Sequence, residues 1–545
     1  MITRRRLTQQ VLALGALAAL CRRPLQAADA VAGAGAPEPI APTWEALRER
    51  YQAPDWFRDA KFGIWAHWSA QCVPEAGDWY ARDMYIQGSR AYEHHLRHYG
   101  HPADVGFMEI DRLWTAANWD PGELLDLYRD AGARYFVALA NHHDNFDTYA
   151  SRYHAWNATR IGPRRDIIGE WSRAARARGL RFGVSNHSAH AWHWFQVAYG
   201  YDPEGPRRGE RYDAWRLTRF DGDGRWWQGL DPQELYGGAT MPMPEGIGSI
   251  AEANAWHSAH DGVWDEAPPL ANPAFVHQWA LRCQDLLESY QPDLVYFDNS
   301  GLPLGQAGLD VTARYYSAAL ARHGRLDVVA TAKNIPPAHA GAVVEDVERG
   351  YRGGIEPRPW QTDTCIGDWH YNRERFEQRS YMDAAAVIHR LCDVVSKNGN
   401  LLLSVPLRGD GTIDAEERRI VGRIGAWNRR FGEAVFATRP WRIHGEGPTP
   451  VRAGAFSEFG AAAFTAADIR YTTRERSLYA ITLGRPGDVV TLPALAGVAV
   501  QRVEMAGTNA PLRFRRDARG LHVSVPAALA DDIGVALRIR GGRLA

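Results

Sequence analysis

Several residues that can bind ligands or transfer protons stand directly after short apolar runs of this sequence. His67 closely follows the run at 62–65, and Asp298 follows the run at 294–297. The same kind of position is held by His142, His143 and His187. When such runs form parallel strands, the residues at their carboxyl ends meet at one face of the sheet or barrel. The spacing therefore predicts one shared site, although each histidine taken alone could equally be a structural residue.

Carboxylates at such a site would suit glycoside hydrolysis. Two-carboxylate glycosidases need an ionised nucleophile and a protonated acid, about 5 Å apart when configuration is retained. Asp298 fits the first role because a buried strand would hold its carboxylate rigidly. Glu345, Asp346 and Glu348 follow the strand-like residues 342–344 and are candidates for the acid, although they could also be surface carboxylates beside nearby arginines.

A metal site is the main alternative from the residues alone. Metal-dependent barrel hydrolases usually use a close His-x-His or Glu-x-x-His pair, and the sequence places a single His67 between tryptophans instead. His142 and His143 are adjacent, so on a strand they would point in opposite directions and could share a metal only from a loop. We predict no metal and no cofactor, and a sugar-binding pocket without catalysis stays a third alternative.

A repeating order of helix and strand would position these residues. The helices expected after Asp120 and Asp166 each begin at a capping side chain and end at a glycine, Gly132 and Gly179. A third helix is predicted to begin at Pro273. Each helix is followed by an apolar run typical of a strand buried on both faces. No glycine-rich phosphate-binding turn follows these runs, which favours a closed barrel over an open doubly wound sheet.

We therefore predict an α/β fold class, with a (β/α)8-like TIM barrel catalytic domain over residues 44–436. Residues 437–545 contain short alternating segments broken by Gly, Pro and Asn, as in an antiparallel β-sandwich. This sandwich is expected to be an accessory domain without chemistry of its own. Residues 196–272 form a long insertion rich in Trp, Gly, Asp and Pro, which we expect to border the substrate entrance.

The first 30 residues have the layout of a signal peptide, with arginines at 4–6, an apolar run at 11–20 and small residues at 27–30. The arginines favour twin-arginine export of a folded protein, with ordinary secretion as the alternative. Ten apolar residues cannot span a bilayer, so no membrane attachment is expected after signal removal. Residues 31–43 are predicted to form a tether, and the mature protein to be periplasmic or extracellular.

The composition narrows the choice of partners. Lys and Arg number 63 and Asp and Glu 64, which gives a formal net charge of −1 and argues against nucleic-acid binding. The 21 Trp suit stacking on sugar rings as well as a large core. Widely spaced cysteines could form disulfides in an oxidising compartment, but the sequence does not pair them. Beyond the signal these are Cys72, Cys283, Cys365 and Cys392.

Eight segments, taken together and in order, resemble the retaining α-L-fucosidases of glycoside hydrolase family 29. Residues 61–68 are similar to the family's K-F-G-I-F-x-H-W-G strand, 141–146 to its K-H-H-D-G-F, and 292–298 to the P-D-x-x-W-F-D segment that carries the nucleophile. The remaining similar segments are 78–80, 165–167, 179–184, 397–403 and 410–413.

The resemblance implies an exo-acting hydrolase that releases α-L-fucose from oligosaccharides or polysaccharides by double displacement. It implies Asp298 as the nucleophile and Glu348 as the acid/base, with Glu345 as the competing candidate. Neutral imidazoles suit sugar hydroxyls because each offers one donor and one acceptor. The implied substrate-binding residues are His67, Asp78, Trp79, His142, His143, His187 and Tyr296.

Two departures from the family pattern concern the sugar pocket. Asp78 replaces a Glu and is one methylene shorter, and residues 185–187 read Ser-Asn-His where Tyr-Tyr-Ser is common. These changes leave the exact glycone open, so that an α-L-galactoside or a substituted fucose is the alternative substrate. A metal-dependent barrel hydrolase is the alternative reaction class.

Overall fold

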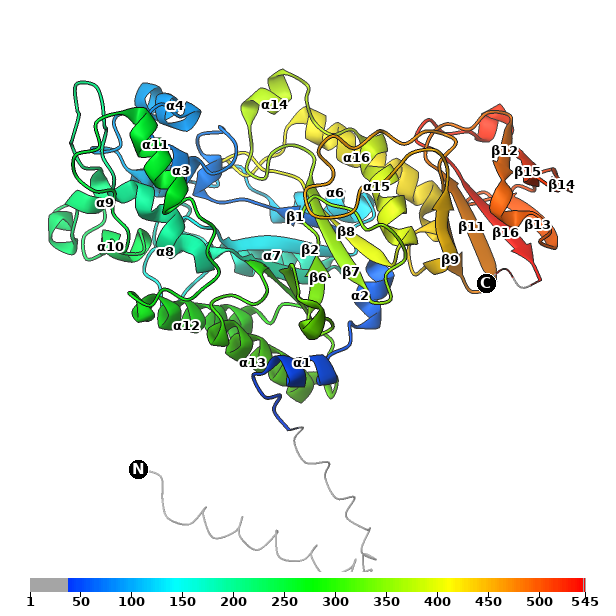
Figure 1. Cartoon of the computed structure of the whole chain (residues 1–545), viewed down its shortest axis with the longest axis horizontal. Coiled ribbons are helices and arrows are strands. Elements are labelled where there is room, and N and C mark those ends of the chain that lie inside the picture. Colours follow the sequence, from blue (N-terminus) through cyan, green and yellow to red (C-terminus); the bar gives the residue numbers. More distant parts are fainter. Residues whose placement is uncertain (1–37, 543, 545) are drawn as a thin grey trace, which may run out of the picture. The chain divides into compact units, whose positions relative to one another are not determined.

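The computed structural model describes residues 38–542 and residue 544 (Figure 1). The predicted signal peptide and most of the predicted tether therefore lie outside the described residues. At the described end of that tether, Ile40 is buried and its amide donates to Ser317 Oγ at 2.8 Å. Thr43 then caps helix α1 (Trp44–Arg50). Among the helices of the described chain, none is both long and apolar enough to cross a bilayer.

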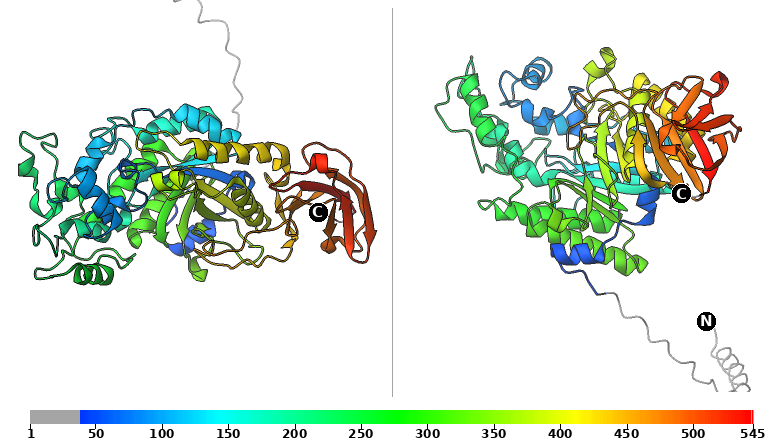
Figure 2. Two further views of the ribbon diagram at one scale, coloured as in Figure 1. Left: turned by 90° about the horizontal axis from the view of Figure 1, so that it is seen from above. Right: turned by 45° about the vertical axis from the view of Figure 1, so that its right-hand side comes forward.

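Eight parallel strands form a closed barrel, which confirms the predicted fold class (Figure 2). The ring closes where β8 pairs with β1. Every residue of β2 is buried, as expected for a strand covered on both faces. The strands are β1 (Phe62–Ala66), β2 (Tyr135–Asn141), β3 (Arg181–Asn186), β4 (Leu294–Ser300), β5 (Val329–Lys333), β6 (Val344–Asp346), β7 (Trp360–Cys365) and β8 (Gly399–Ser404).

Capped helices connect most of the barrel strands. The Asp120 carboxylate accepts the amides of Gly122 and Glu123, and Asp166 and Asn272 cap their helices in the same way. Asp120 and Asp166 are the predicted caps, and each such cap is worth about 1 kcal/mol. The helices are α2 (Asp55–Ala60), α6 (Pro121–Asp130), α7 (Ile167–Ala177), α12 (Pro273–Tyr290), α13 (Gln306–His323), α14 (Arg373–Glu377), α15 (Ala384–Ser396) and α16 (Ala415–Phe431).

Two of the barrel connections depart from the regular strand–helix order. The connection from β5 to β6 holds only the 3₁₀ turn η5 (Pro337–His339). Residues 347–359, between β6 and β7, contain no helix at all. The carboxyl end of β6 therefore lacks the helix that normally follows and anchors a barrel strand.

Two long segments extend the carboxyl ends of the strands. They contact each other where Arg82 pairs with Asp261 at 2.6 Å, and in Figure 1 their helices lie at the left. After β1 come η1 (Ala70–Cys72), α3 (Tyr80–Asp83), α4 (Arg90–His98) and α5 (Phe107–Leu113). After β3 come η2 (Ser188–His190), α8 (Ala191–Trp194), η3 (Phe195–Tyr199), α9 (Asp213–Arg216), η4 (Arg219–Gly222), α10 (Pro232–Leu235) and α11 (Ile250–Ala259).

The C-terminal region forms two antiparallel sheets, one of five strands and one of three. Buried polar contacts join it to the barrel: Arg470 pairs with Asp393 of α15 at 2.7 Å, and Trp427 of α16 donates to Gly534 O at 2.9 Å. The strands are β9 (Arg439–Glu446), β10 (Ile469–Arg474), β11 (Ser477–Thr482), β12 (Val489–Leu492), β13 (Val500–Met505), β14 (Phe514–Asp517), β15 (Gly520–Ser524) and β16 (Ala536–Gly541).

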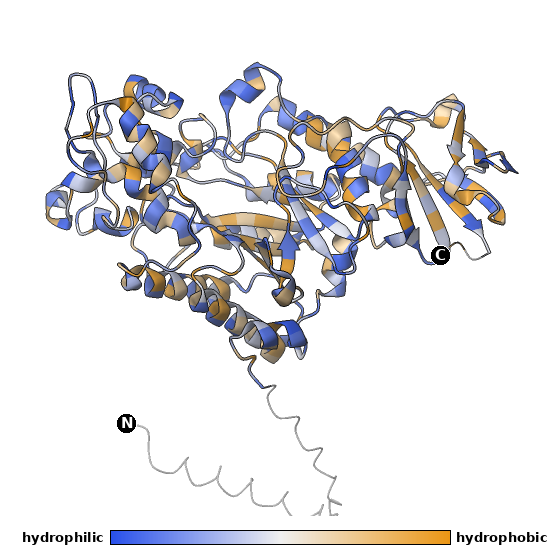
Figure 3. Ribbon diagram, in the orientation of Figure 1, coloured by the Kyte–Doolittle hydropathy of each residue, from blue (hydrophilic) through white to orange (hydrophobic). Residues whose placement is uncertain are grey.

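Strand β7 is an element that the apolar pattern did not predict. Figure 3 shows hydrophobic colouring along much of the barrel, but β7 carries the polar run 361–364, and all of it is buried. Internal hydrogen bonds satisfy these groups: Gln361 Nε2 donates to Asp346 at 2.7 Å, and Thr362 Oγ1 donates to Val347 O at 2.7 Å. A strand whose polar side chains are satisfied by hydrogen bonds to neighbouring segments shows no hydrophobic signal.

The four cysteines of the described chain are buried and unpaired. Each thiol lies in its own part of the structure, on η1, α12, β7 and α15. The disulfides that the sequence left open are therefore not formed in this structure.

Candidate active site

A cavity of about 330 Å³ lies at the carboxyl ends of the barrel strands. This is the end at which enzymes with this fold carry their active sites. Six of the predicted substrate-binding residues and both predicted catalytic residues line it. The lining residues are Trp65, His67, Trp79, His142, His143, His187, Trp264, Tyr296, Asp298, Asn299, Ser300, Lys333, Asn334, Glu348, Asp363, Trp369 and Phe456.

Asp298 projects from β4, which extends three residues beyond the predicted end of that strand. Its carboxylate pairs with Lys333, lies 3.0 Å from His187 Nδ1 and 3.4 Å from His143 Nε2. Burial opposes ionisation, but the Lys333 charge and the neighbouring histidines outweigh burial and hold the pKa of Asp298 well below its ordinary value. Asp298 is therefore an ionised, fixed carboxylate.

Glu348 lies two residues beyond the end of β6 and faces the same cavity. Its Oε2 accepts a hydrogen bond from Lys333 Nζ at 2.5 Å. Burial is the largest influence on Glu348 and, together with the Asp363 and Asp298 charges, outweighs Lys333 and raises the pKa of Glu348 to about 7. The site thus holds one carboxylate that stays ionised and another that keeps its proton near neutral pH.

Lys333, at the end of β5, joins the two carboxylates and was not predicted from the sequence. A hydrogen bond spans about 3 Å, so the two oxygens that share this ammonium lie within about 6 Å of each other. Retaining glycosidases place their carboxyl groups about 5–5.5 Å apart, and inverting enzymes about 6.5–9.5 Å. This upper limit is below the separation found in inverting enzymes and is compatible with retention.

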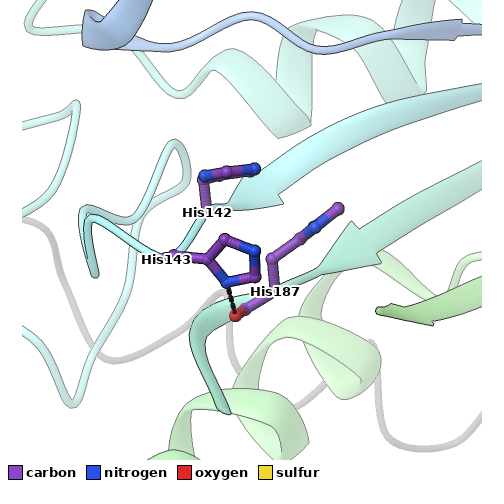
Figure 4. Close-up of side chains that lie close together, drawn as sticks. All are labelled: His142, His143 and His187. Atoms are coloured by element: carbon purple, nitrogen blue, oxygen red, sulfur yellow. Dashed lines mark hydrogen bonds between the residues drawn. The ribbon is translucent and has the colours of Figure 1, made fainter. Parts of the chain in front are cut away.

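Four buried histidines form the floor of the cavity, three of which appear in Figure 4. Burial lowers the pKa of His67, His142 and His187, and it lowers that of His143 to about 3. All four rings are therefore neutral at ordinary pH. His187 Nε2 has no hydrogen-bond partner among the described residues, which is unusual for a buried polar atom and suits a ligand rich in hydroxyl groups.

Aromatic side chains form the walls of the cavity. Trp65 and Trp369 are packed against His67, with ring centroids 3.9 and 4.9 Å from it. Trp79 and Trp264 stand at the rim with nearly parallel rings, and Trp264 is 41% exposed. Trp264 belongs to the predicted insertion, which therefore borders the cavity entrance. Such flat apolar surfaces suit the apolar face of a sugar.

Two predicted candidates lie away from the cavity. Asp78 does not line it in the described chain, because its carboxylate accepts the amides of Trp369 at 3.1 Å and His370 at 2.7 Å. The side chain that was expected to bind the sugar instead holds the Trp369 wall. Glu345 forms an ion pair with Arg352 at 2.6 Å, also outside the lining. Glu348 is the candidate acid that shares Lys333 with Asp298.

The histidines also deserve comparison with a metal site. In the described chain, His142, His143 and His187 form a group whose ligand atoms lie within 4.8 Å of one another. His143 Nδ1, however, donates to His187 O at 2.8 Å and its Nε2 faces Asp298, while His142 Nδ1 is 2.9 Å from Gln71 Nε2. Three of these ring nitrogens therefore have protein partners, whereas His187 Nε2 has none among the described residues.

Comparison with known proteins agrees with this geometry. The sequence profile of the family described as Alpha-L-fucosidase matches residues 28–433. The chain is 25% identical over 511 residues to tissue alpha-L-fucosidase of Rattus norvegicus, which covers 92% of each chain. It is also 25% identical to plasma alpha-L-fucosidase of Homo sapiens, over 89% of this chain and 88% of that protein.

Solved structures share the same fold. The structure of Thermotoga maritima alpha-fucosidase in complex with fucose superposes with a TM-score of 0.65 at 24% identity, over 92% of this chain and 99% of that one. Alpha-L-fucosidase isoenzyme 1 from Paenibacillus thiaminolyticus superposes with a TM-score of 0.61 at 21% identity, over 91% and 99%.

Proposed function

The chain belongs to the α-L-fucosidase family, and we propose that it hydrolyses α-L-fucosides by double displacement with Asp298 as nucleophile and Glu348 as acid/base. The observation that carries these two roles is the pairing of both carboxylates with one lysine at the cavity floor. Their environments hold one ionised and the other protonated, as the two roles require.

In the first step, the Asp298 carboxylate attacks the anomeric carbon and forms a covalent fucosyl ester. The bond to the leaving oxygen breaks, and Glu348 transfers its proton to that oxygen. The charge on Asp298 disappears as the ester forms, so Lys333 then pairs with the carboxylate that Glu348 has become. One lysine in contact with both groups keeps the site neutralised throughout.

In the second step, Glu348 accepts a proton from a water molecule, and the resulting nucleophile attacks the anomeric carbon from the face that the aglycone has left. The ester bond to Asp298 breaks and free fucose forms. Two inversions give net retention of the α configuration. Glu348 is protonated again and Asp298 is ionised again, so the enzyme returns to its starting state.

The four neutral histidines are proposed to bind the fucose hydroxyls. A ring nitrogen that no protein group engages, such as His187 Nε2, can donate to or accept from a hydroxyl group according to its tautomer. We propose that Trp65 and Trp369, which line the cavity, pack against the apolar face of the sugar and its methyl group. A cavity of about 330 Å³ bordered by the rim tryptophans suits a single terminal sugar, which supports exo action on fucosylated oligosaccharides or polysaccharides.

Export through the twin-arginine route is proposed from the first 30 residues. Supporting this, the described cysteines are all unpaired and buried, as expected for a chain that folds in a reducing compartment before export. Replacing Arg4, Arg5 and Arg6 with lysine should leave the protein in the cytoplasm. Fractionation of expressing cells would detect this, and unchanged export would contradict the route.

The test of the activity is hydrolysis of 4-nitrophenyl α-L-fucoside by the protein without residues 1–30. We expect turnover that chelator does not affect and that Asp298→Asn lowers at least about 1,000-fold, because the covalent step is lost. Proton NMR during the reaction should show α-fucose as the first product. A β product first, or turnover independent of Asp298, would contradict double displacement.

A further inference from the structure

The loop between β9 and β10, residues 447–468, reaches the active-site cavity from the C-terminal sheets. Phe456 of this loop lines the cavity together with Glu348. The sequence predicted an accessory sandwich with no chemistry, so this contact was unexpected. It places a segment far away in the chain directly beside the proposed acid/base.

Backbone hydrogen bonds attach the loop to the residues that carry Glu348. The Phe456 amide donates to Glu348 O at 2.7 Å, and the Glu458 amide donates to Arg349 O at 3.0 Å. A Cβ atom at Gly350 would lie only 2.3 Å from Gly454 O, so the two backbones approach as closely as a glycine allows. The loop thus contacts residues 348–351 through its backbone, with an isolated β-bridge between Tyr351 and Gly454 followed by turns at 455–460.

The Glu458 carboxylate fixes this attachment from inside the protein. It is 7% exposed and pairs with Arg349 and with Arg390 of α15. It also accepts a hydrogen bond from Thr364 Oγ1 of β7 at 2.7 Å. Buried charges held by such a network are costly to leave without a partner. Glu458 therefore couples the residue next to Glu348 to two rigid elements of the barrel.

The barrel itself holds the Glu348 segment from one side, where Val347 and Arg349 donate their amides to Gln361 O and Asp363 O of β7 at 2.9 and 3.1 Å. Residues 347–359 contain no helix, so Glu348 stands on an irregular segment just beyond the short strand β6. Arg349 has a left-handed backbone with φ 45, an uncommon conformation for a residue with a side chain. In place of a helix, the 447–468 loop donates the hydrogen bonds to Glu348 O and Arg349 O.

We propose that Glu458 is a positioning residue that holds Glu348 in place for proton transfer, acting through Arg349. This inference rests on the proposed function, because it takes Glu348 as the acid/base. Glu458 itself does not line the cavity in the described chain. A displacement of the catalytic acid by about 1 Å can lower the rate about 100-fold. A carboxylate outside the cavity can therefore control proton transfer to the leaving group.

The experiment compares leaving groups in the Glu458→Gln variant. With phenyl α-L-fucoside, whose leaving group needs a proton, we expect kcat/KM to fall about 10- to 100-fold. With 2,4-dinitrophenyl α-L-fucoside, which leaves without a proton, it should change less than about 3-fold. Azide should raise kcat for the dinitrophenyl substrate and give α-fucosyl azide, because azide attacks the ester from the face that the aglycone has left and needs no base.

Two further variants separate positioning from general damage. Glu504→Gln removes another buried glutamate of the sheets, which pairs with Arg538 at 2.9 Å, and should lower thermal stability without changing the leaving-group dependence. Thr364→Val removes one donor to Glu458 and should give a smaller effect in the same direction. It decides the question if Glu458→Gln does not fold.

The outcomes of the two proposals are distinct. If the unmodified protein hydrolyses neither aryl fucoside, the proposed function fails. If the unmodified protein is active and Glu458→Gln or Thr364→Val shows a steeper leaving-group dependence than Glu504→Gln, the positioning role is supported. If kcat/KM of the folded variants depends on the leaving group as it does in the unmodified protein, Glu458 does not position Glu348 and the inference is overturned.

Discussion

At the scale of single residues, the charge of the site depends on one lysine. The chain has only three lysines among 63 basic residues, and one of them, Lys333, contacts both catalytic candidates. Its compact ammonium can bond to two carboxylates at once, whereas the larger planar guanidinium of arginine would push them apart. The lysine therefore explains how Asp298 stays ionised in a buried site.

Replacing Lys333 with Met should lower kcat/KM about 100-fold or more, because one preorganised charge at a reacting centre is typically worth that much. Loss of the cation should also raise the pKa of Asp298 from its present low value. The acidic limb of the pH–rate profile should therefore move to higher pH. Lys333→Arg is the matched control for charge, and an unchanged acidic limb in Lys333→Met would contradict this account.

The activity of the unmodified protein should fall on the alkaline side of pH 7. The first step needs a protonated Glu348, whose pKa is raised to about 7 chiefly by burial, so kcat/KM should decline about tenfold per pH unit above this value. Asp298 has a pKa well below its ordinary value, so no acidic loss is expected down to about pH 4. A kcat/KM profile from pH 4 to 9 tests both limbs, and a constant rate up to pH 9 would refute the assignment.

The sequence predicted most of the residues that gather in the cavity, but not how they interact. The histidines and Asp298 could be found because each follows a strand, and strand ends converge in a barrel. Glu348 was selected over Glu345 only by resemblance. Lys333 carries no signal in a single sequence beyond its position at a strand end, and the shortened Asp78 turned out to hold Trp369.

At the scale of elements, capped helices and apolar strands were predictable, whereas β7 and the loops were not. The polar residues of β7 give no apolar pattern from which a strand could be predicted, because hydrogen bonds rather than apolar contacts accompany their burial. The limits of the insertion could be predicted from its composition. The position of Trp264 at the cavity could not, because it depends on long-range contacts. One of them joins Glu266, two residues further on, to the Ser300 amide at 2.7 Å.

We predict that Trp264 contributes to binding of the aglycone. Trp264→Ala should lower kcat/KM for a fucosylated disaccharide about 10-fold, which is the usual value of one stacking aromatic side chain. Inhibition by free fucose should stay unchanged, because fucose occupies only the inner cavity. Trp226→Ala is the matched control, since Trp226 is an exposed tryptophan of the same insertion that does not line the cavity. Equal effects of both variants would refute the prediction.

At the scale of the whole molecule, the barrel and the C-terminal sheets act as one unit. The sheets share buried ion pairs with α15 and send residues 447–468 to the catalytic face. The sequence predicted both domains but treated the second as separate in function. Contacts between segments about 100 residues apart leave no local pattern, so this cooperation could not be inferred before the fold was known.

The state of the cysteines links the fold to the proposed route of export. Because all four thiols of residues 38–542 are buried and unpaired, Ellman's reagent should label none of them in the folded protein and all four after denaturation. Reductant should leave the melting temperature unchanged, since losing a disulfide would cost about 2–5 kcal/mol. Fewer than four thiols in protein purified from the exported fraction would mean that a bond formed during passage through an oxidising compartment. That result would favour export of an unfolded chain, because a chain that folds first keeps these thiols apart on separate elements.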